Sequence, residues 1–344
     1  MFQGMEYVYE VYKERSFSKA AANLFISQPS LSANVKRVEQ KIGSPIFDRS
    51  VKPLQLTECG QAYIRAAERI MGEEKEFMQY VNDLGNLKTG SLVLGGSNLF
   101  SSWILPTLIA EFAAKYPDIR ISMIEENTAE LVKKLQKGQI DLILDNSRLS
   151  PELFEHSVFK TEWLLLAVPK KFAVNQGLEA YQLSLESIRS GAFHDNAVPC
   201  VPLEAFRGQA FAMMKKENDT GERAKRICEK EQMNPLVVFE MDQQMTSYNI
   251  TCSGLGISFV GDTLIARIPP NEEVVYYKLP ETDSVREICF YWKKGRYFTK
   301  AMEEFVLLCT GAECMSDDCT GAGCMSTECM SAECMSDDCT GADL

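Results

Sequence analysis

The chain has 344 residues, of which 45% are hydrophobic, so it is long enough for two or three domains with packed cores. Its apolar runs fall short of the roughly eighteen residues that cross a bilayer, and its start lacks a secretion signal, so we expect a soluble, cytoplasmic protein. The net charge of −12 argues against a nucleic-acid-binding surface spread over the whole chain.

The charge is divided unevenly along the chain. Residues 1–65, the head, hold nine Lys and Arg against six Asp and Glu, a net of +3, whereas residues 309–344 hold eight acidic residues and no Lys or Arg. A modestly basic head on an acidic body is expected when only one end of a protein meets phosphates. The charge pattern therefore favours nucleic-acid contact by the head alone.

Three helices are predicted in the head. The first has apolar residues at helical spacing over 5–12, and the second begins with Ser18 as N-cap and runs through Phe25. Ser27 caps a third helix that extends to about residue 42. Two helices separated by so short a turn indicate a helix-turn-helix.

The third helix has two unlike faces. Leu31, Val35 and Val38 lie on one side, which we expect to be buried. The opposite side and the N-terminal end carry Ser27, Gln28, Pro29, Ser30, Ser32, Ala33, Lys36 and Arg37. Such a surface suits the major groove, because an amide pairs with adenine and cations reach phosphates or guanine. The alternative is an ordinary amphipathic helix with a solvated polar face.

Two short extended runs, around 45–47 and 54–57, flank a basic, proline-bearing turn. They predict a β-wing. Arg49 and Lys52 would then lie beside the DNA backbone or the minor groove.

The head resembles the LysR-type transcriptional regulators. The matching residues are Ala21-Ala22-x-Leu24-x-Ile26-Ser27-Gln28-Pro29-Ser30-Leu31-Ser32, Val35-Lys36-x-Val38-Glu39, Ile42-Gly43, Pro45-Ile46-Phe47-x-Arg49 and Leu56-Thr57-x-x-Gly60. The resemblance implies operator contacts from the turn, the third helix and the wing. It also implies an α+β multidomain chain, with a winged helix-turn-helix over 1–58 (the helix-turn-helix about 17–36), a linker helix over 59–89 and a periplasmic-binding-protein-like effector domain over 90–308. Ala33 stands where many relatives have Arg or Lys, so base contact there would be apolar or absent.

A long helix is predicted from about 58 to 87, with Thr57 as its cap. Its apolar residues recur with heptad-like spacing at Tyr63, Ala67, Ile70, Phe77, Val81 and Leu84. This stripe suits an antiparallel partner helix, or else packing against the same chain. The resemblance implies a homodimer, usually assembled further into a homotetramer.

From Gly90 the pattern alternates short strands and helices. Strands at 91–94, 119–124 and 140–144, with a helix after Asn98 and another from Thr128, predict a parallel sheet. We expect two α/β lobes with a cleft between them: lobe I over 90–161 and 268–308, and lobe II over 162–267. The chain would return to the first lobe through 274–279 and 287–292.

Polar residues at strand ends and helix starts are predicted to meet in this cleft. They are Ser97, Asn98, Thr128, Asn146, Asn218 and Gln243. Backbone N–H groups at a helix start favour an anion, so we expect a small carboxylate or another polar metabolite as effector. The alternative for each residue alone is a helix cap or a turn former.

Residues 309–344 repeat every five residues and place a cysteine at each repeat. Seven thiols, four methionines and eight acidic residues suit soft cations such as Cu(I), or Zn(II), but the spacing is not the C-x₂-C of structured zinc sites. A disordered acidic extension is the plainer interpretation. A metal-responsive regulator working through this tail stays open as a rival function.

An enzyme is the rival from another class. The chain has only two histidines and no P-loop, G-x-G-x-x-G or H-E-x-x-H motif. We therefore expect neither catalysis nor a cofactor, and we expect the partners to be double-stranded DNA, a small effector and further copies of the chain.

Overall fold

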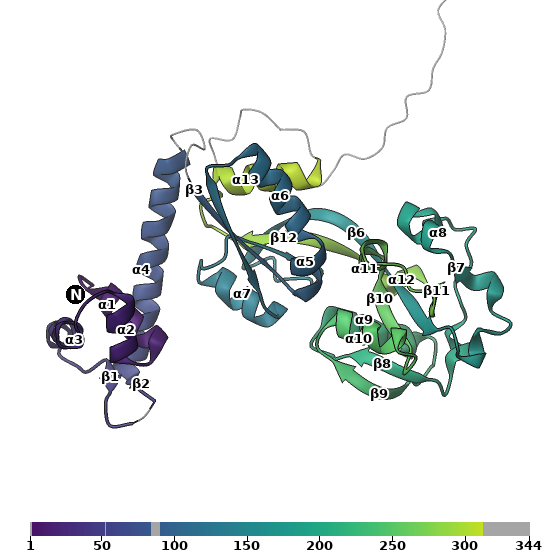
Figure 1. The fold of residues 1–344 in the computed structure, drawn as a ribbon, viewed down its shortest axis with the longest axis horizontal. Helices are drawn as coiled ribbons and strands as arrows, with labels where there is room; N and C mark the ends of the chain where they lie inside the picture. The colour runs from purple at the N-terminus through teal and green to yellow at the C-terminus, as the bar shows by residue number, and fades with distance from the viewer. Residues whose placement is uncertain (1, 52, 84–89, 312–344) are drawn as a thin grey trace, which may run out of the picture. The chain divides into compact units, whose positions relative to one another are not determined.

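The computed structural model describes residues 2–51, 53–83 and 90–311. The described part of the first 83 residues forms helices and a two-stranded hairpin, and residues 90–311 are built around an eight-stranded mixed sheet (Figure 1). Among the described helices, none is both long enough and apolar enough to cross a membrane.

The head consists of three helices, a hairpin and the start of a long helix. Its elements are α1 (Met5–Glu14), α2 (Phe17–Asn23), α3 (Gln28–Ile42), β1 (Phe47–Asp48), β2 (Gln55–Leu56) and α4 (Glu58–Asp83). The two strands are antiparallel, with Phe47 opposite Leu56, so the predicted wing is present. One apolar core joins these elements through Val8, Val11, Leu31, Val35, Ile46 and Tyr63.

The ends of α3 follow the predicted local chemistry. The Ser27 hydroxyl accepts a hydrogen bond from the Ser30 N–H, and Gly43 ends the helix with a φ of 80°, a conformation that glycine adopts without Cβ strain. The predicted start of α2 at Ser18 is wrong. Ser16 is the N-cap, because its extended backbone lets its hydroxyl accept from the Lys19 N–H.

The long helix α4 begins as predicted, where the Thr57 hydroxyl accepts a hydrogen bond from the Gly60 N–H over 2.9 Å. The predicted end at 87 lies outside the described residues. The predicted apolar stripe divides in two: Tyr63 and Ala67 are buried in the head, whereas farther along the exposed apolar side chains include Phe77, Met78 and Val81. The first half of α4 therefore packs in the head core. In the second half Tyr80 packs on Tyr297, but the described part of the chain leaves Phe77, Met78 and Val81 exposed.

The large sheet has the strand order β4-β3-β5-β12-β6-β11-β7, and β10 also pairs with β6. The strands are β3 (Gly90–Gly96), β4 (Ile119–Glu125), β5 (Leu142–Asp145), β6 (Phe154–Pro169), β7 (Gln182–Leu183), β10 (Ser258–Gly261), β11 (Val274–Lys278) and β12 (Val285–Lys293). As predicted, β3 runs parallel to β4 and β5. Beside this sheet, β8 (Ala210–Met214) and β9 (Leu236–Met241) form a separate parallel pair.

The helices around the strands are α5 (Asn98–Trp103), α6 (Leu105–Lys115), α7 (Thr128–Gln136), α8 (Leu185–Ser190), α9 (Asp219–Lys230), α10 (Gln244–Cys252), α11 (Asp262–Arg267), α12 (Glu281–Ser284) and α13 (Lys300–Thr310). Short 3₁₀ turns lie at Ala173–Asn175, Glu179–Tyr181, Ala192–His194 and Leu203–Phe206. The single helix predicted after Asn98 is two helices, because Ile104 leaves the regular helical backbone and Pro106 has no N–H to donate. Cys309, which the repeat pattern assigned to the tail, is part of α13.

Strand β6 runs through both lobes of the α/β region. Its first half pairs with β12 and its second half with β10 and β11. We call β3, β4 and β5 with α5, α6, α7 and α13 the first lobe, and β8, β9 and β10 with α9 and α10 the second lobe. The predicted return through 274–279 is wrong, because β11 extends the ladder on Leu165–Pro169 and pairs with β7. Strand β12 makes the return, since it pairs with β5.

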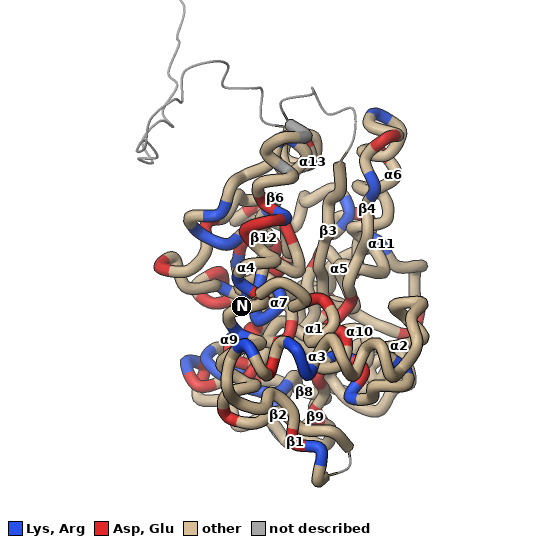
Figure 2. Tube along the Cα trace, turned by 90° about the vertical axis from the view of Figure 1, so that its left-hand side faces the viewer, with Lys and Arg blue, Asp and Glu red and all other residues tan. Residues whose placement is uncertain are grey.

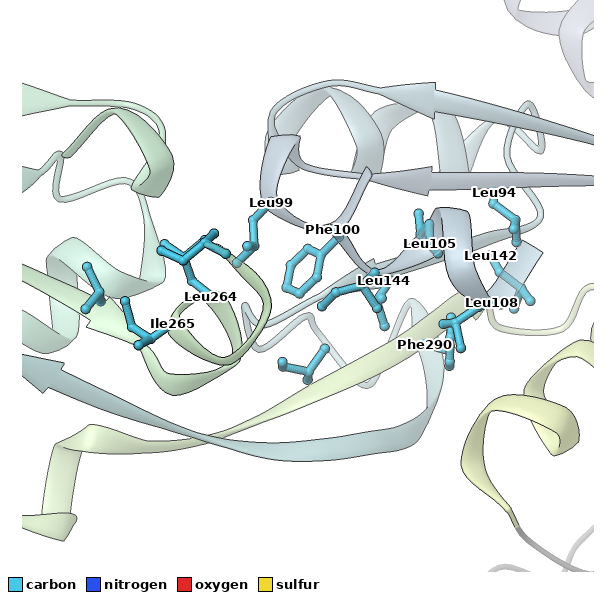
Figure 3. Packing of buried hydrophobic residues seen from close by; sticks show 14 of the residues in the cluster. Leu94, Leu99, Phe100, Leu105, Leu108, Leu142, Leu144, Leu264, Ile265 and Phe290 are labelled. Atoms are coloured by element: carbon cyan, nitrogen blue, oxygen red, sulfur yellow. The ribbon is translucent and has the colours of Figure 1, made fainter. Parts of the chain in front are cut away.

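Apolar packing joins elements that lie far apart in the sequence. In one core, Leu99 and Phe100 of α5 lie near Leu264 and Ile265 of α11 (Figure 3). A second core fills the space under β8 and β10 and includes Phe211, Phe259 and Tyr277. Leu99 and Phe100 of α5 and Tyr248 of α10 belong to the first of these cores, so buried packing fixes both helices that begin at the cleft.

Candidate functional site

The solvent-facing side of α3 is polar and basic. The buried stripe of Leu31, Val35 and Val38 faces the head core. Of the predicted contact residues, the structure leaves exposed Ser27, Gln28, Pro29, Ser30, Ala33, Lys36 and Arg37, while Ser32 is half-buried. Figure 2 shows basic positions on α3. One face of one helix therefore presents hydroxyl, amide, methyl and cationic groups together.

Neighbouring side chains orient this face. The Ser18 hydroxyl donates a hydrogen bond to Gln28 Oε1 over 3.2 Å, and the Arg37 guanidinium donates to Asn34 Oδ1 over 3.1 Å. Both contacts are exposed, so water or a ligand can replace them at little cost.

The wing is fastened to α3 by Glu39. One carboxylate oxygen accepts from the Ile46 and Phe47 N–H groups, and the other accepts from the Arg49 guanidinium over 3.1 Å. The Arg49 guanidinium also lies 5.2 Å from the ring centroid of Phe17. Arg49 is thus part of the joint between wing and helix while remaining exposed, and Lys52 lies outside the described residues.

The predicted position of Phe25, in the second helix, is wrong. The second helix ends at Asn23, not at Phe25, and Phe25 lies in the turn with a φ of 54° and 95% of its side chain exposed. This exposed aromatic residue lies in the turn between α2 and α3, three residues before Gln28. The sequence signal for a turn at Phe25 is its position two residues before Ser27, the N-cap of α3, because the chain must leave α2 before it reaches that cap.

Most of the predicted effector residues do meet in a cleft between the lobes. A small inner cavity of about 40 Å³ is lined by Ser97, Leu99, Asn127, Thr128, Asn146, Asn218, Thr220, Asp242, Gln243 and Gln244. It adjoins a wider mouth of about 480 Å³, lined by Glu125, Glu126, Asn127, Thr128, Ala129, Lys215, Glu217, Asn218, Asp242 and Gln243. Asn98 does not line either cavity, and its side chain donates to Glu125 over 2.9 Å.

Thr128 and Asn146 are held by buried carboxylates, one on β5 and one on β6. The Thr128 hydroxyl donates to Asp145 Oδ2 over 2.8 Å, and the Asn146 amide donates to Glu162 Oε2 over 3.4 Å. Burial raises the pKa of Asp145, and hydrogen bonds from Ser147 and Thr128 oppose this. These contacts fix Thr128 and Asn146 at the carboxyl end of β5.

A buried charge network lies behind the cleft, and sequence analysis missed it. The Arg286 side chain is 1% exposed and contacts Glu162 Oε2 at 2.6 Å and Asp219 Oδ2 at 2.8 Å. It also donates to the Thr220 hydroxyl over 2.9 Å. The available signal was weak: Glu162 and Arg286 each lie just before an apolar run, in β6 and β12, and such charges must find partners if they are buried.

Gln244 is the lining residue with unmet hydrogen-bonding capacity. Gln244 is 7% exposed, and neither its Nε2 nor its Oε1 atom has a hydrogen-bond partner among the described residues. It is the first residue of α10, whose N-cap Gln243 makes no side-chain capping bond. The first turn of α10 therefore lacks a side-chain cap for its N–H groups, and the residues at its start, Gln243 and Gln244, line the inner cavity.

The described residues contain no group of three or more His, Cys, Asp and Glu that could hold a metal ion. The described cysteines are free thiols, and burial raises the pKa of Cys228 to about 12 and of Cys289 to about 11. These two thiols are therefore protonated near neutral pH. The predicted cation site of the repeat tail lies outside the described residues.

The head and the α/β region match two family models. Residues 2–61 match the bacterial regulatory helix-turn-helix protein, lysR family, and residues 85–312 match the LysR substrate binding domain. The chain is 26% identical over 304 residues to the uncharacterized HTH-type transcriptional regulator YcgK of Bacillus subtilis (strain 168), which covers 88% of this chain and 92% of that one. It is 35% identical over 159 residues to a probable RuBisCO transcriptional regulator of Cyanidioschyzon merolae (strain NIES-3377 / 10D), and this alignment covers 45% of this chain and 52% of that one.

Solved structures share the fold. CbnR complexed with its target DNA superimposes with a TM-score of 0.60 at 16% identity, over 90% of this chain and 99% of that one. A full-length OxyR from Pseudomonas aeruginosa superimposes with a TM-score of 0.62 at 17% identity, over 90% of this chain and 94% of that one. Because the two family models together span most of its length, the chain belongs to the LysR family of transcriptional regulators.

Proposed function

We propose that this regulator binds double-stranded operator DNA by placing the exposed surface of α3, from Ser27 to Arg37, in the major groove. One observation supports this most: the amide and cationic side chains suited to contacting bases and phosphates are exposed on α3, away from its buried stripe. In this proposal Gln28 pairs with adenine, Lys36 and Arg37 reach guanine or phosphates, and Ala33 meets a thymine methyl group or no base. CbnR, which shares the fold, was solved with its target DNA.

Arg49 has a supporting part in this proposal. Its guanidinium has five N–H donors, and its bond to Glu39 uses only some of them. The remaining donors face solvent beside α3 and can meet a phosphate, as can Lys52.

We infer that a small molecule in the cleft modulates operator binding. Ser97, Thr128, Asn146, Asn218 and Gln243 come from both lobes, so a ligand that contacts them favours one lobe arrangement over others. A coupling of about 1–3 kcal/mol between cleft and operator changes DNA affinity or bending enough to switch transcription.

The proposal includes a homodimer or homotetramer joined through the exposed apolar half of α4. Two or four heads on one DNA raise the local concentration without new contacts, which offsets the small positive charge of each head. The protein acts by binding, without catalysis or a cofactor, and works in the cytoplasm where the operator lies.

The test measures operator preference with Gln28→Ala and Arg37→Ala. At low salt we expect the full chain to prefer some promoter fragments over random duplex of equal length, and each variant to weaken that preference about tenfold or more. The matched control is Arg207→Ala, which removes an exposed arginine of the α/β region that pairs with Glu204. An unchanged preference in Gln28→Ala and Arg37→Ala contradicts the proposed interface.

A further inference from the structure

The mouth of the cleft holds more negative than positive charge. Of its four carboxylates, Asp242 pairs with Lys215 at 2.8 Å, and Glu126 pairs with Lys134 at 3.0 Å. Within the described part of the chain, Glu125 and Glu217 make no ion pair. Glu125 comes from the first lobe, where it accepts a hydrogen bond from the Asn98 side chain, and Glu217 comes from the loop before α9, where its charge helps to raise the pKa of Lys215. Each side of the mouth therefore contributes one carboxylate without an ion pair.

The inner end of the same cleft is less acidic, because Asp242, which already pairs with Lys215, is the only charged residue among the described residues that line it. Its lining includes neither Lys nor Arg, but it has the uncapped first turn of α10, whose N–H groups carry partial positive charge. Gln244, almost fully buried and without a partner, offers one more N–H₂ donor and one acceptor there. Buried polar groups are normally hydrogen-bonded, so this side chain indicates a site for a polar ligand group.

The inner cavity and the mouth are continuous. They share Asn127, Thr128, Asn218, Asp242 and Gln243 in their linings, and the mouth has the volume of a small-metabolite site. A single molecule can therefore touch the α10 end with one group and the two glutamates with another.

We propose that the effector is an ammonium-bearing carboxylic acid of amino-acid type, with its carboxylate at Gln244 and the start of α10 and an ammonium group between Glu125 and Glu217. This inference rests on the proposed effector function of the cleft. These two carboxylates, which make no ion pair with a described residue, disfavour a second negative group at the mouth, because like charges repel. A dicarboxylate is thus rejected by the same feature that holds the amine.

The experiment uses the full-length protein and three five-carbon probes that differ only in their ends: 5-aminopentanoate, 1,5-diaminopentane and glutarate, each at 10 mM, with L-ornithine as a fourth. Thermal unfolding is followed by tryptophan fluorescence, since all three tryptophans lie between residues 103 and 292. We expect 5-aminopentanoate and L-ornithine to raise the midpoint by a few degrees, 1,5-diaminopentane to raise it less, and glutarate to leave it unchanged.

Two variants locate the ammonium. Glu217→Gln removes a carboxylate that makes no ion pair with a described residue, and it is expected to raise the dissociation constant of L-ornithine about tenfold. Glu126→Gln is the matched control in the same mouth, because Lys134 already neutralises that carboxylate, and it should leave binding within about twofold.

Several results overturn the inference. They are stabilisation by glutarate, no stabilisation by either amino acid, or equal effects of Glu217→Gln and Glu126→Gln. Preference for promoter DNA without any ligand belongs to the proposed function and is measured separately. A chain that keeps this preference but responds to glutarate refutes the ammonium site alone.

Discussion

Arg286 is a buried cation behind the cleft, and its two carboxylate partners are 124 and 67 residues away in sequence. A charge in such surroundings costs several kcal/mol unless it is paired. The ion pairs with Glu162 and Asp219 therefore hold β12, β6 and the start of α9 together behind the ligand cleft.

We predict that Arg286→Met lowers the free energy of unfolding by about 3–5 kcal/mol, because it leaves Glu162 buried without a counter-charge. Urea unfolding followed by tryptophan fluorescence measures the change. The double variant Arg286→Met with Glu162→Gln should recover part of the loss. Arg207→Met, at an exposed ion pair, should change stability by less than about 1 kcal/mol. Equal losses in the two arginine variants would contradict the assigned role of burial.

Asp262 gives a prediction about pH. Burial, and then the neighbouring Glu162 carboxylate, raise the pKa of Asp262 to about 6. An unfolded aspartate titrates near 3.9, so the folded protein binds this proton more tightly and loses stability as the pH rises from about 4 to about 6.

Asp262→Asn removes this titration and keeps an oxygen that accepts from the Trp163 N–H. We expect the variant to be more stable than the natural chain by on the order of 2–3 kcal/mol at pH 7, and the difference to shrink toward pH 4.5. Urea unfolding at several pH values measures it, with Asp118→Asn, at an exposed turn, as the control. A difference that stays constant with pH would show that Asp262 does not titrate in this range.

At the scale of elements, local chemistry determines helix ends and tertiary packing determines strand partners. Ser27, Pro29 and Gly43 predicted the limits of α3 because caps and breakers act within a few residues. The partner of β11 could not be predicted, because the same apolar run fits either lobe. The Arg286–Glu162 pair was missed for the same reason: its members meet only once β6 and β12 have paired.

In the candidate cleft, too, the features set by local sequence were predicted and those set by tertiary contacts were not. Helix starts and strand ends predicted five of its lining residues, since the topology of parallel strands brings these ends together. Gln244 and the acidic mouth were not predicted, because their significance depends on which neighbours remain without partners.

Two glycines of α4 test how the long helix joins the head. A Cβ at Gly60 would lie 2.0 Å from the Ile46 carbonyl oxygen, whereas a Cβ at Gly72 meets nothing within 4 Å. Gly60→Ala must therefore push the wing from the helix, and we expect it to destabilise the head by about 2–3 kcal/mol. Gly72→Ala should be neutral or stabilising by up to about 1 kcal/mol.

Hydrogen–deuterium exchange of the segment 28–42 reports the effect, because no tryptophan lies in the head. Exchange should accelerate in Gly60→Ala and stay unchanged in Gly72→Ala. Equal protection of α3 in both variants would show that the contact at Ile46 is not required.

At the scale of the whole molecule, the second half of α4 has apolar side chains that the described part of the chain does not cover. Phe77 is 64% exposed, and Met78 and Val81 are exposed beside it. Contiguous apolar side chains on a long helix usually mark an interface. We predict that Phe77→Asp converts the oligomer to monomers, as measured by sedimentation, whereas Glu73→Gln on the same helix leaves assembly unchanged.

The same variant links assembly to DNA binding through salt. The logarithm of the DNA-binding constant falls with the logarithm of salt concentration by about 0.9 for each phosphate neutralised. A dimer places two copies of Lys36, Arg37 and Arg49 on one duplex, so the slope for the natural chain should be about twice that of Phe77→Asp. At 0.15 M salt the DNA affinity of Phe77→Asp should lie below that of the natural chain by more than the difference in slope explains. The reason is that a second head no longer binds the same DNA at a raised local concentration. Equal slopes for the two proteins would mean that one head alone contacts the DNA, and paired binding through α4 would have to be abandoned.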